Sequence, residues 1–587
     1  MTSSITVQPS VMGDPALLTI IANRLETIVR EMINTLLRTS CSGVLNTARD
    51  FSCAILTRDN RLLVFAESLP IHVAAIELEG RVMSDFHGDT LAPGDAFINN
   101  SPYHGGTHHA DHTILVPVFW RDEHVMTVCA KAHQADTGNA KPTTYAPASL
   151  DIYDEGSVSL PCVRIQRDYH DDDDLVRICR QRIRVPDQWY GDYLAALGAV
   201  RVGERALTEL FAKYGSGTVA EFVEDWFDYS ERRMVSELSQ LPAGSWGGDG
   251  RHDPFPGVPE GIPLQAKVSI DADAPRVTVD LRDNIDNVPC GLNLSEATAR
   301  AAALIGVFNG LDPDIPINGG SLRRVDVLLR TGSVAGIPEH PVSCSSATTN
   351  VADRLVNLVS STMATIRPAY GQAEGGLGTP ASRAVISGED PRRQGARYIN
   401  QMFLGNTGGP ATSDCDGWVT FIVPVSGGFC YRDSVEVDEQ KYPIHVRSVT
   451  VIPDSGGGGR LQGGPGTLVE FGPATEAPLR VIYASDGHHY PARGVLGGLD
   501  GRAASVELID ADGRVTPAPL VADLHLHEGE RIRAGTCGGG GYGDPAERSH
   551  DRVREDVEEG LISLEYATRV YGFIAGASSP ERQELAL

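Results

Sequence analysis

The densest group of chemically active side chains lies in one short segment, NNSPYHGGTHHADH at 99–112. It contains four histidines and Asp111, and His133 follows in the motif KAHQAD. Imidazole and carboxylate groups together suit Zn, Mn or Fe(II). A lone histidine in a loop is usually a hydrogen-bonding or surface residue, but six histidines between 104 and 133 beside an aspartate favour a metal site. Such a site would support metal-assisted hydrolysis, or carbanion or enolate chemistry stabilised by the metal.

Two predicted strands, 113–120 and 124–130, bring these groups together. His108 and Asp111 lie three residues apart on the loop that enters the first strand, and His133 lies at the far end of the second strand. Adjacent strands of a hairpin are only ~5 Å apart, so the three side chains can converge. Asp50 opens an earlier predicted strand, 51–56, and could add a fourth oxygen.

The remaining motifs give weaker evidence of a chemical function. The glycine-rich segments 454–459, 463–466 and 537–543 do not match the phosphate-binding pattern GxxxxGK[ST]. We predict that they form bends in β structure, where glycine supplies positive φ. No GxSxG motif occurs, and Cys537 is predicted to be an ordinary buried cysteine rather than a nucleophile. The acidic run 168–174 is predicted to be a solvated loop.

The composition disfavours several classes of protein. The 587 residues include 50 Lys or Arg and 77 Asp or Glu, a net charge of −27, which disfavours nucleic-acid binding and docking on anionic membranes. No stretch approaches ~18 consecutive apolar residues, so no transmembrane helix is expected. The first residues, MTSSITVQPSVMGDP, lack the features of a signal peptide. The ten cysteines form no CxxC motif, so we expect reduced thiols in a cytoplasmic protein and no cysteine-built zinc site.

Helices and short strands alternate along the chain. An amphipathic helix is predicted to begin with Asp14 as N-cap and Pro15 in its first turn. Short strands fill 50–165, and two helices follow between 190 and 240. The segment 242–263, rich in Gly, Pro and Asp, is predicted to be a boundary.

The predicted fold class is α+β, in a mixed multi-domain chain with an N-terminal metal-binding α/β region and a β-rich second half. Strands are expected at 266–270, 276–281, 445–452, 467–471, 479–483 and 505–509, and helices at 295–308, 546–559 and 563–572. We therefore predict a metal-binding domain at 1–245, a β-rich and glycine-rich region at 246–545, and a helical tail at 546–587.

Ordered motifs along the whole chain resemble those of the hydantoinase B family, which contains the B subunits of hydantoinases, oxoprolinases and caprolactamases and is related to acetone carboxylase. The motifs are RTSCSGVLNTARDFSCAI, PGDAFINNSPYHGGTHHADHTILVPVF, AHQADTG, EGSVSLP, GLNLSEATARAA, DPDIPINGGSLR, PDSGGGGRLQGGPG, GVLGGLDG, AGTCGGGGYGDPAER and GLISLEYATRVYGF. They occur in the family's order.

The resemblance implies metal ligands at specific positions. The family's GGTHxxD motif falls on His108 and Asp111, and its second HxxD motif falls on His133. Its DFS motif makes Asp50 a further ligand or a group beside the ligands. The ion is expected to be divalent Zn, Mn or Fe.

The resemblance also implies two acidic groups near the site, Asp136 and Glu155, as supporting residues or general bases. One departure from the family pattern is visible. Members often have a double glycine after the second HxxD motif, where this chain has Gly138 and Asn139. The identity of the substrate is therefore not inherited from the family.

In this family an A-type partner chain holds ATP and phosphorylates the substrate, and the B-type chain completes the reaction. We therefore predict the metal-bearing B-type chain of an ATP-dependent hydrolase of cyclic amides such as hydantoins or lactams. An A-type ATP-binding partner and a cytoplasmic (AB)2 heterotetramer are expected. The alternatives are a component of a ketone carboxylase of the acetone carboxylase type, a metal-dependent hydrolase that acts alone without ATP, and a non-catalytic scaffold in such a complex.

Overall fold

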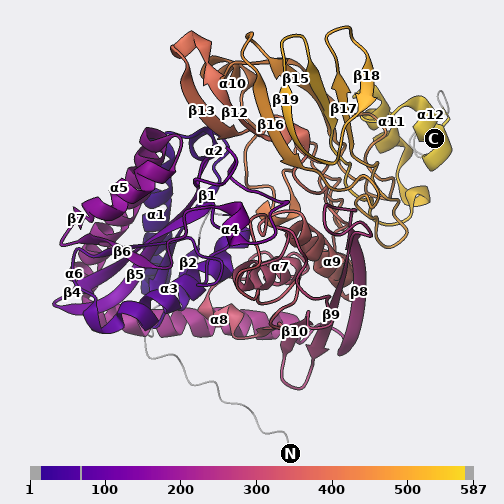
Figure 1. The fold of residues 1–587 in the computed structure, drawn as a ribbon. Helices are drawn as coiled ribbons and strands as arrows, with labels where there is room; N and C mark the ends of the chain where they lie inside the picture. The colour runs from indigo at the N-terminus through magenta and orange to yellow at the C-terminus, as the bar shows by residue number, and fades with distance from the viewer. Residues whose placement is uncertain (1–14, 66–68, 575–587) are drawn as a thin grey trace, which may run out of the picture.

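The structure is a computed structural model that describes residues 15–65 and 69–574. It contains helices and four β-sheets, which confirms the predicted α+β class (Figure 1). The predicted N-cap Asp14 lies outside the described residues, whereas the predicted first helix is present as α1 (Pro15–Thr39). Within the described residues, no helix combines the length and apolar character that crossing a membrane requires.

The N-terminal part is built on an antiparallel sheet with the strand order β2-β1-β5-β4-β3-β6-β7. Its strands are β1 (Phe51–Thr57), β2 (Leu62–Phe65), β3 (Ala96–Asn99), β4 (Asp111–Trp120), β5 (Glu123–His133), β6 (Val163–Arg167) and β7 (His170–Asp171). The predicted strands of this region are confirmed, and β4 and β5 extend further than predicted toward the histidine-rich loop.

Helices cover both faces of this sheet. Gly203 of α6 (Pro186–Leu238) packs near Val128 of β5, and Val128 pairs with Ile55 of β1. The next residue of β1, Leu56, points to the opposite face and packs near Gly80 of α3 (Val73–His87). Because successive side chains of a strand alternate between faces, α6 and α3 lie on opposite sides of the sheet.

Two predicted elements of this region differ in detail. The two helices expected between 190 and 240 form α6, which is interrupted at Gly215, where φ is +78°. The acidic run 168–174, predicted to be a loop, instead contains β7 and the start of α5 (Asp173–Arg182). The Asp172 side chain accepts a hydrogen bond from Leu175 N, because aspartates stabilise the unpaired N–H groups at a helix start.

The middle part is a four-stranded sheet, β11-β10-β9-β8, packed against two helices. Its elements are β8 (Gly244–His252), β9 (Ile262–Asp271), β10 (Arg276–Asp280), α7 (Glu296–Phe308), α8 (Gly319–Leu322), β11 (Val325–Leu328) and α9 (Val351–Ile366). The segment 242–263, predicted as a boundary, thus contains the edge strand β8. Helix α9 was not predicted. Its polar residues recur at helical spacing, but they are buried like its apolar residues and contact neighbouring segments instead of solvent: Asp353, Arg354, Asn357 and Ser360.

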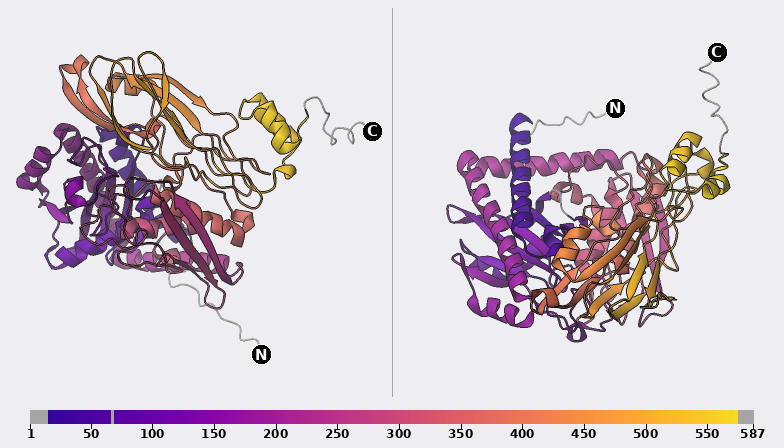
Figure 2. Two further views of the ribbon diagram at one scale, coloured as in Figure 1. Left: turned by 45° about the vertical axis from the view of Figure 1, so that its right-hand side comes forward. Right: turned by 90° about the horizontal axis from the view of Figure 1, so that it is seen from above.

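The C-terminal part contains two sheets, ordered β13-β12-β16-β19 and β14-β15-β20-β17-β18. Side chains of both sheets share one hydrophobic core, so they form a sandwich. Its strands are β12 (Val385–Asp390), β13 (Ala396–Gln401), β14 (Ile444–Val451), β15 (Thr467–Pro473), β16 (Leu479–Ala484), β17 (Ser505–Ile509), β18 (Val515–Pro517), β19 (Val521–Leu526) and β20 (Arg531–Gly535). Figure 2 shows the sandwich against the other two parts, with the C-terminal helices at its far end.

Short helices complete the described chain. They are α2 (Gly43–Asn46), α4 (Ile152–Glu155), α10 (Val435–Lys441), α11 (His550–Glu558) and α12 (Leu564–Tyr571). The two closing helices, α11 and α12, confirm the prediction for the end of the chain. They pack around a small core of their own.

Most glycines of the glycine-rich segments do not have positive φ, so the prediction is wrong for them; positive φ occurs at Gly543 (+73°) and at the non-glycine Asp454 (+62°). Instead, buried extended segments lie side by side and exchange backbone hydrogen bonds. Gly457 N donates to Gly539 O, Gly539 N to Gly464 O, and Gly464 N to Gly409 O, each at 2.9 Å. None of these four glycines has positive φ. Glycine is required because a Cβ atom on any of them would overlap a neighbouring backbone.

Two buried carboxyl groups beside α10 make the stability of the protein depend on pH. Asp433 and Asp438 are each 2% exposed. In the described chain, Asp433 Oδ1 and Asp438 Oδ2 are buried and accept no hydrogen bond from an N–H or hydroxyl group. This is expected for two carboxyl groups that share a proton. Burial raises the pKa of Asp433 to about 7 and the pKa of Asp438 to about 8. The ordinary value in an unfolded chain is about 3.9, so between pH 4 and 8 the folded state retains protons that the unfolded state releases.

Stability from this pair is therefore greatest at low pH and falls as the pH rises through that window. We expect Asp438→Asn to reduce the loss of stability between pH 5.5 and 9 by about 1 to 3 kcal/mol relative to the native chain. Urea unfolding at both pH values measures the difference. The same change at the exposed Asp512 should leave the pH dependence unaltered, and equal effects of the two variants would contradict the prediction.

Candidate metal centre

Three of the predicted ligands meet where two strands adjoin. Asp111 begins β4, His133 ends β5, and the two residues pair directly in the antiparallel ladder. Asp111 Oδ1 lies 3.1 Å from His133 Nδ1 and 3.1 Å from His108 Nε2. One ligand atom from each residue lies within 4.8 Å of the others, and all three side chains are buried. The register of two strands therefore brings the three residues together.

The separations suit a single ion. Ligand atoms about 2.1 Å from one tetrahedral or octahedral ion lie about 3.0 to 3.4 Å apart. The 3.1 Å distances from Asp111 Oδ1 to the two imidazole nitrogens fall in this range. Nitrogen and oxygen donors suit Zn, Mn or Fe(II). The residues present therefore fit a divalent metal.

Neighbouring groups hold each candidate ligand in place. The Nδ1 atom of His108 lies 2.8 Å from the backbone oxygen of Ser345, which directs its Nε2 atom toward Asp111. The Nε2 atom of His133 lies 2.9 Å from Thr144 Oγ1. Such contacts fix the tautomer and the orientation of a ligating imidazole.

One buried imidazole of the site, His72, was missed in the sequence. Its Nε2 atom lies 3.2 Å from Asp111 Oδ2, and its Nδ1 atom lies 2.8 Å from Ser52 Oγ. Burial alone would raise the pKa of Asp111, but the nearby His108 and His72 imidazoles hold that pKa well below its usual range. A single histidine between Ile71 and Val73 carries no spacing signal, so only the structure reveals it.

Asp50, the residue before β1, lines a buried cavity that Asp111 and His133 also line. Its backbone oxygen accepts a hydrogen bond from His133 N at 3.1 Å, and its side chain lines the cavity beside Asp111 and His133. Burial and the Asp111 carboxylate raise the pKa of Asp50, whereas the surrounding imidazoles lower it. The position suits a further oxygen ligand or a group beside the ligands, as the sequence predicted.

The structure places Asp136 away from the residues that line this cavity. Its carboxylate accepts hydrogen bonds from Gly138 N at 3.0 Å and Arg184 N at 2.5 Å. The neighbouring Asn139 is buried and donates to Thr143 O at 2.9 Å. Both side chains stabilise the loop after β5 by hydrogen bonds. Of the two roles predicted for Asp136, supporting residue or general base, the geometry favours the supporting role.

Glu155 also lies outside the lining of the cavity. Its Oε1 atom pairs with His109 Nδ1 at 2.9 Å, and its Oε2 atom accepts from Ser343 Oγ at 2.9 Å. Ser343 belongs to the loop whose Ser345 carbonyl contacts His108. Glu155 thus connects the histidine-rich loop to the loop before α9, which again favours a supporting role.

The cavity at the site combines segments from the N-terminal part and the second half of the chain. It offers about 40 Å³ of free space, enough for an ion and one or two water molecules. Its lining includes Asp50, Leu69, Ile71, His72, Asp111, His133, Tyr145, Thr348, Thr349, Arg383, Gln401, Phe403, Ile422, Val423, Val425, Ser426 and Cys430. Tyr145 also lines a neighbouring cavity of about 320 Å³, so this residue borders both the site and a larger space.

Cys537, considered in the sequence as a nucleophile, belongs to the glycine-rich region instead. It is fully buried, and burial raises the pKa of its thiol to about 12. Its Sγ atom accepts a hydrogen bond from Leu377 N. The predicted structural role of Cys537 therefore agrees with its surroundings.

A fully buried ion pair between Lys131 and Glu79 is connected to Asp111 through Thr107. Lys131 Nζ lies 3.0 Å from Glu79 Oε1, and both side chains are 0% exposed. Lys131 also donates to Thr107 Oγ1 at 3.4 Å, and Thr107 donates to Asp111 Oδ2 at 2.5 Å. Thr113 and Asn99 donate to the same Glu79 oxygen. A continuous chain of contacts therefore runs from the ion pair to the candidate metal ligand.

We expect Lys131→Met to destabilise the protein by about 3 to 5 kcal/mol, because it leaves the Glu79 carboxylate buried without its cation. Metal affinity should fall by about 10-fold, since Thr107 loses a partner. Urea unfolding and metal titration measure the two effects. Adding Glu79→Gln should restore part of the stability, because a neutral amide needs no counter-ion. A double variant less stable than Lys131→Met alone would contradict this account.

Comparison with known proteins shows similarity over almost the whole chain. The family model described as Hydantoinase B/oxoprolinase matches residues 14–545. The chain is 29% identical over 572 residues to the caprolactamase beta subunit of Pseudomonas jessenii, with 96% of each chain covered. It is 26% identical over 581 residues to the putative D-/L-hydantoinase B subunit of Pseudomonas sp. (strain NS671), with 95% of each covered.

Solved structures show the same similarity. The crystal structure of ATP-dependent caprolactamase from Pseudomonas jessenii superimposes with a TM-score of 0.88 at 28% identity, covering 98% of this chain and 99% of that chain. The nucleotide-free structure of acetone carboxylase superimposes with a TM-score of 0.82 at 16% identity, covering 98% of this chain and 82% of that chain. At that identity the second similarity concerns the fold alone.

Proposed function

Because the chain belongs to the Hydantoinase B/oxoprolinase family, we propose that it is the metal-bearing subunit of an ATP-dependent enzyme that hydrolyses a cyclic amide. A lactam or a hydantoin is the proposed substrate class, since the relatives are named caprolactamase and hydantoinase. The proposed partner is an A-type subunit that binds ATP, in an (AB)2 assembly. The absence of a GxxxxGK[ST] motif from this sequence agrees with a nucleotide site on the partner.

One observation carries the proposal. His108, Asp111 and His133 place their ligand atoms within 4.8 Å of one another in a buried cavity. A scaffold protein would not need three buried ionisable groups in that arrangement, since each costs free energy to bury. The cluster therefore supports a catalytic role over a scaffold role.

The chemistry explains why ATP and a metal would act together. Resonance stabilises an unstrained amide and makes its carbon a poor electrophile. Phosphorylation of the oxygen by the partner removes that resonance. The net reaction consumes two waters and one ATP, breaks the ring C–N bond and yields an amine, a carboxylate, ADP and phosphate; one water opens the ring and the second releases the phosphoryl group. A divalent metal at the site would lower the pKa of water and supply a nucleophile at neutral pH.

The side chains of this chain have separate proposed tasks. His108, Asp111 and His133 would hold the metal, and Asp50 would add an oxygen or lie beside it. Thr144 and the Ser345 carbonyl orient the imidazoles. The buried surroundings exclude bulk water, which strengthens electrostatic interactions with developing charge.

The test is to purify the chain together with its A-type partner and to measure ADP release with lactams, hydantoins and ketones, with and without bicarbonate. We expect ring opening that depends on ATP and on both subunits, and a product heavier than the substrate by one water. A product heavier by carbon dioxide would identify a carboxylase instead. Turnover of a cyclic amide by the chain alone without ATP would refute the two-subunit proposal.

A further inference from the structure

One residue of the metal cavity, Arg383, is a buried cation that forms no ion pair at contact distance with an acidic residue in the described part of the chain. It ends a short 3-10 helix (Ala381–Arg383) just before β12 and is 2% exposed. Its guanidinium lies 5.5 Å from the centre of the Phe403 ring. In the described part of the chain, no carboxylate lies within ion-pair distance of it.

The other buried cations of the described chain are all paired. Lys131 pairs with Glu79 at 3.0 Å. Arg354 makes two hydrogen bonds of 2.8 Å to Asp486. Arg548 pairs with Asp416 and Asp556 at 2.7 Å each. Burying a charge without a counter-ion costs several kcal/mol, so the exception at Arg383 requires an explanation.

The hydrogen bonds of Arg383 leave part of its guanidinium free. Nη1 donates to the backbone oxygens of Gly378 at 3.3 Å and Ile422 at 3.2 Å. The buried Nε atom has no partner in the described chain. The carboxyl of Asp353 accepts from Gly378 N and Val425 N, and burial raises its pKa to about 7. Asp353 therefore gives Arg383 no direct ion pair and only partial charge compensation near neutral pH.

A second unpaired polar group lies on the same cavity. Gln401 Oε1 is buried without a donor, while Gln401 Nε2 donates to Tyr145 Oη at 3.2 Å. Arg383, Gln401 and Asp111 all line the cavity. The cavity thus offers one free cationic donor and one free acceptor near the candidate metal ligands.

We propose that Arg383 binds the phosphoryl oxyanion of the activated substrate, and that Gln401 Oε1 accepts a hydrogen bond from its protonated ring nitrogen. The metal cavity itself holds only an ion and one or two water molecules, so the ring would lie toward the neighbouring cavity of about 320 Å³ that Tyr145 also lines. This inference rests on the proposed function, because the phosphoryl group comes from ATP on the A-type partner. A guanidinium presents several N–H donors in a geometry that matches an oxyanion. The substrate would supply a negative charge in direct contact with Arg383, whereas Asp353 acts on Arg383 without a direct ion pair.

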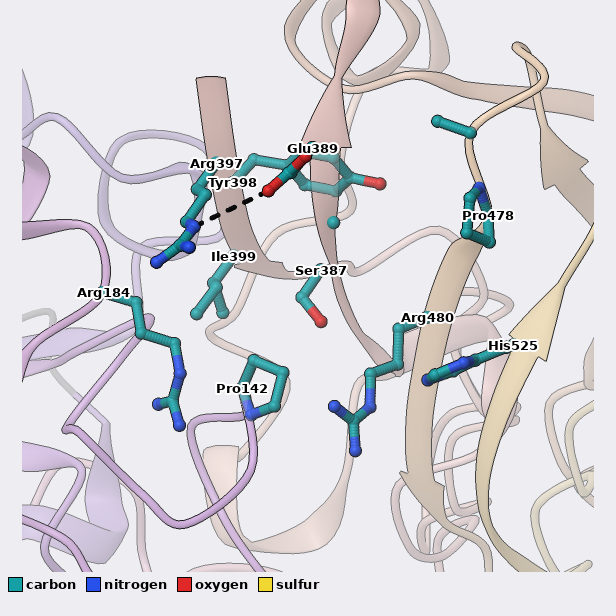
Figure 3. A pocket seen from close by; sticks show the side chains of 12 residues that line it. Pro142, Arg184, Ser387, Glu389, Arg397, Tyr398, Ile399, Pro478, Arg480 and His525 are labelled. Carbon is teal, nitrogen blue, oxygen red and sulfur yellow. Dashed lines mark ion pairs between the residues drawn. The ribbon is translucent and has the colours of Figure 1, made fainter. Parts of the chain in front are cut away.

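A larger cavity elsewhere is a rival site for an anion. It offers about 540 Å³ between the loop after β5 and the sandwich, and three arginines and His525 line it (Figure 3). These arginines already have acidic partners. Arg480 makes hydrogen bonds of 2.7 and 2.8 Å to Asp523, Arg184 lies 3.4 Å from Asp136, and Arg397 lies 3.8 Å from Glu389. Their charge is compensated, so they need no ligand.

Binding of inorganic phosphate tests the inference on the full chain loaded with Mn²⁺. Calorimetry should show phosphate binding that weakens by at least about 10-fold in Arg383→Gln and by less in Arg383→Lys, which retains the charge. Arg480→Gln in the rival cavity is the matched control and should bind phosphate as the native chain does. A titration with acetate tests whether Arg383 binds a carboxylate rather than a phosphoryl oxyanion. Arg383-dependent binding of acetate, without binding of phosphate, would overturn the phosphoryl assignment.

Turnover by the complex with the A-type partner supplies the second measurement. We expect Arg383→Gln to keep its metal content and its folded circular dichroism spectrum while ring opening falls by about 100-fold. Unchanged phosphate affinity and unchanged turnover in this variant would overturn the inference. If the native complex opens no cyclic amide but phosphate binding still depends on Arg383, the proposed function fails and the oxyanion site stands.

Discussion

His133→Ala is expected to abolish stoichiometric metal binding and to lower ring opening by the two-subunit enzyme by about 1,000-fold or more. His133 Nδ1 lies 3.1 Å from Asp111 Oδ1 in the candidate site, and the residue ends β5 directly opposite Asp111. Alanine removes the donor and leaves the backbone ladder intact, so the effect should be on the metal and not on folding. Metal content per chain, measured by mass spectrometry after purification, and ATP-dependent turnover check the expectation.

A matched control separates the site from a general effect of losing an imidazole. His445 is 56% exposed and pairs with Glu439 at 3.0 Å on the sandwich. His445→Ala should bind metal and turn over substrate as the native chain does. If His133→Ala retains one bound metal per chain and full turnover, the assignment of the metal centre is wrong. Asp50→Asn should have a smaller effect than His133→Ala if Asp50 lies beside the ligands rather than among them.

The core of the site could be predicted because it depends on local strand geometry. His108 and Asp111 precede a strand and His133 ends its hairpin neighbour, so spacing along the chain translates directly into proximity. His72 and Arg383 could not be found in this way. They reach the cavity from single positions before α3 and β12. His72 approaches within the N-terminal part, where it meets Ser52 and Asp111, whereas the approach of Arg383 depends on how the sandwich packs against the N-terminal sheet.

For the fold as well, elements that depend on local sequence were predicted, whereas elements that depend on packing between distant segments were not. A short β-branched strand such as β17 was predicted at its observed bounds. Helix α9 was missed although its polar residues recur at helical spacing; these residues are buried against distant segments, so the helix does not have the solvent-exposed face of an ordinary amphipathic helix. The glycine-rich segments were predicted to need glycine for positive φ, whereas they need it for close backbone packing between segments far apart in the chain.

Because of that packing, we expect Gly539→Ala to be strongly destabilising. A Cβ atom at Gly539 would overlap the backbone oxygen of Gly409. The backbone cannot move aside freely, because Gly539 N donates to Gly464 O and Gly539 O accepts from Gly457 N. Overpacking and the disruption of buried hydrogen bonds together should cost about 3 to 5 kcal/mol. Urea unfolding of the isolated chain measures the loss.

Gly217→Ala is the matched control, because it is the same chemical change at a site with open space. Gly217 lies on the exposed side of α6, and a Cβ atom there would meet nothing within 4 Å. Alanine has a higher helix propensity than glycine, so Gly217→Ala should be neutral or should stabilise the protein by up to about 1 kcal/mol. Equal stability of the two variants would show that the extended glycine segments tolerate side chains. The difference expected between the two variants follows from the distance at which neighbouring backbones approach, which is very short at Gly539 and beyond 4 Å at Gly217.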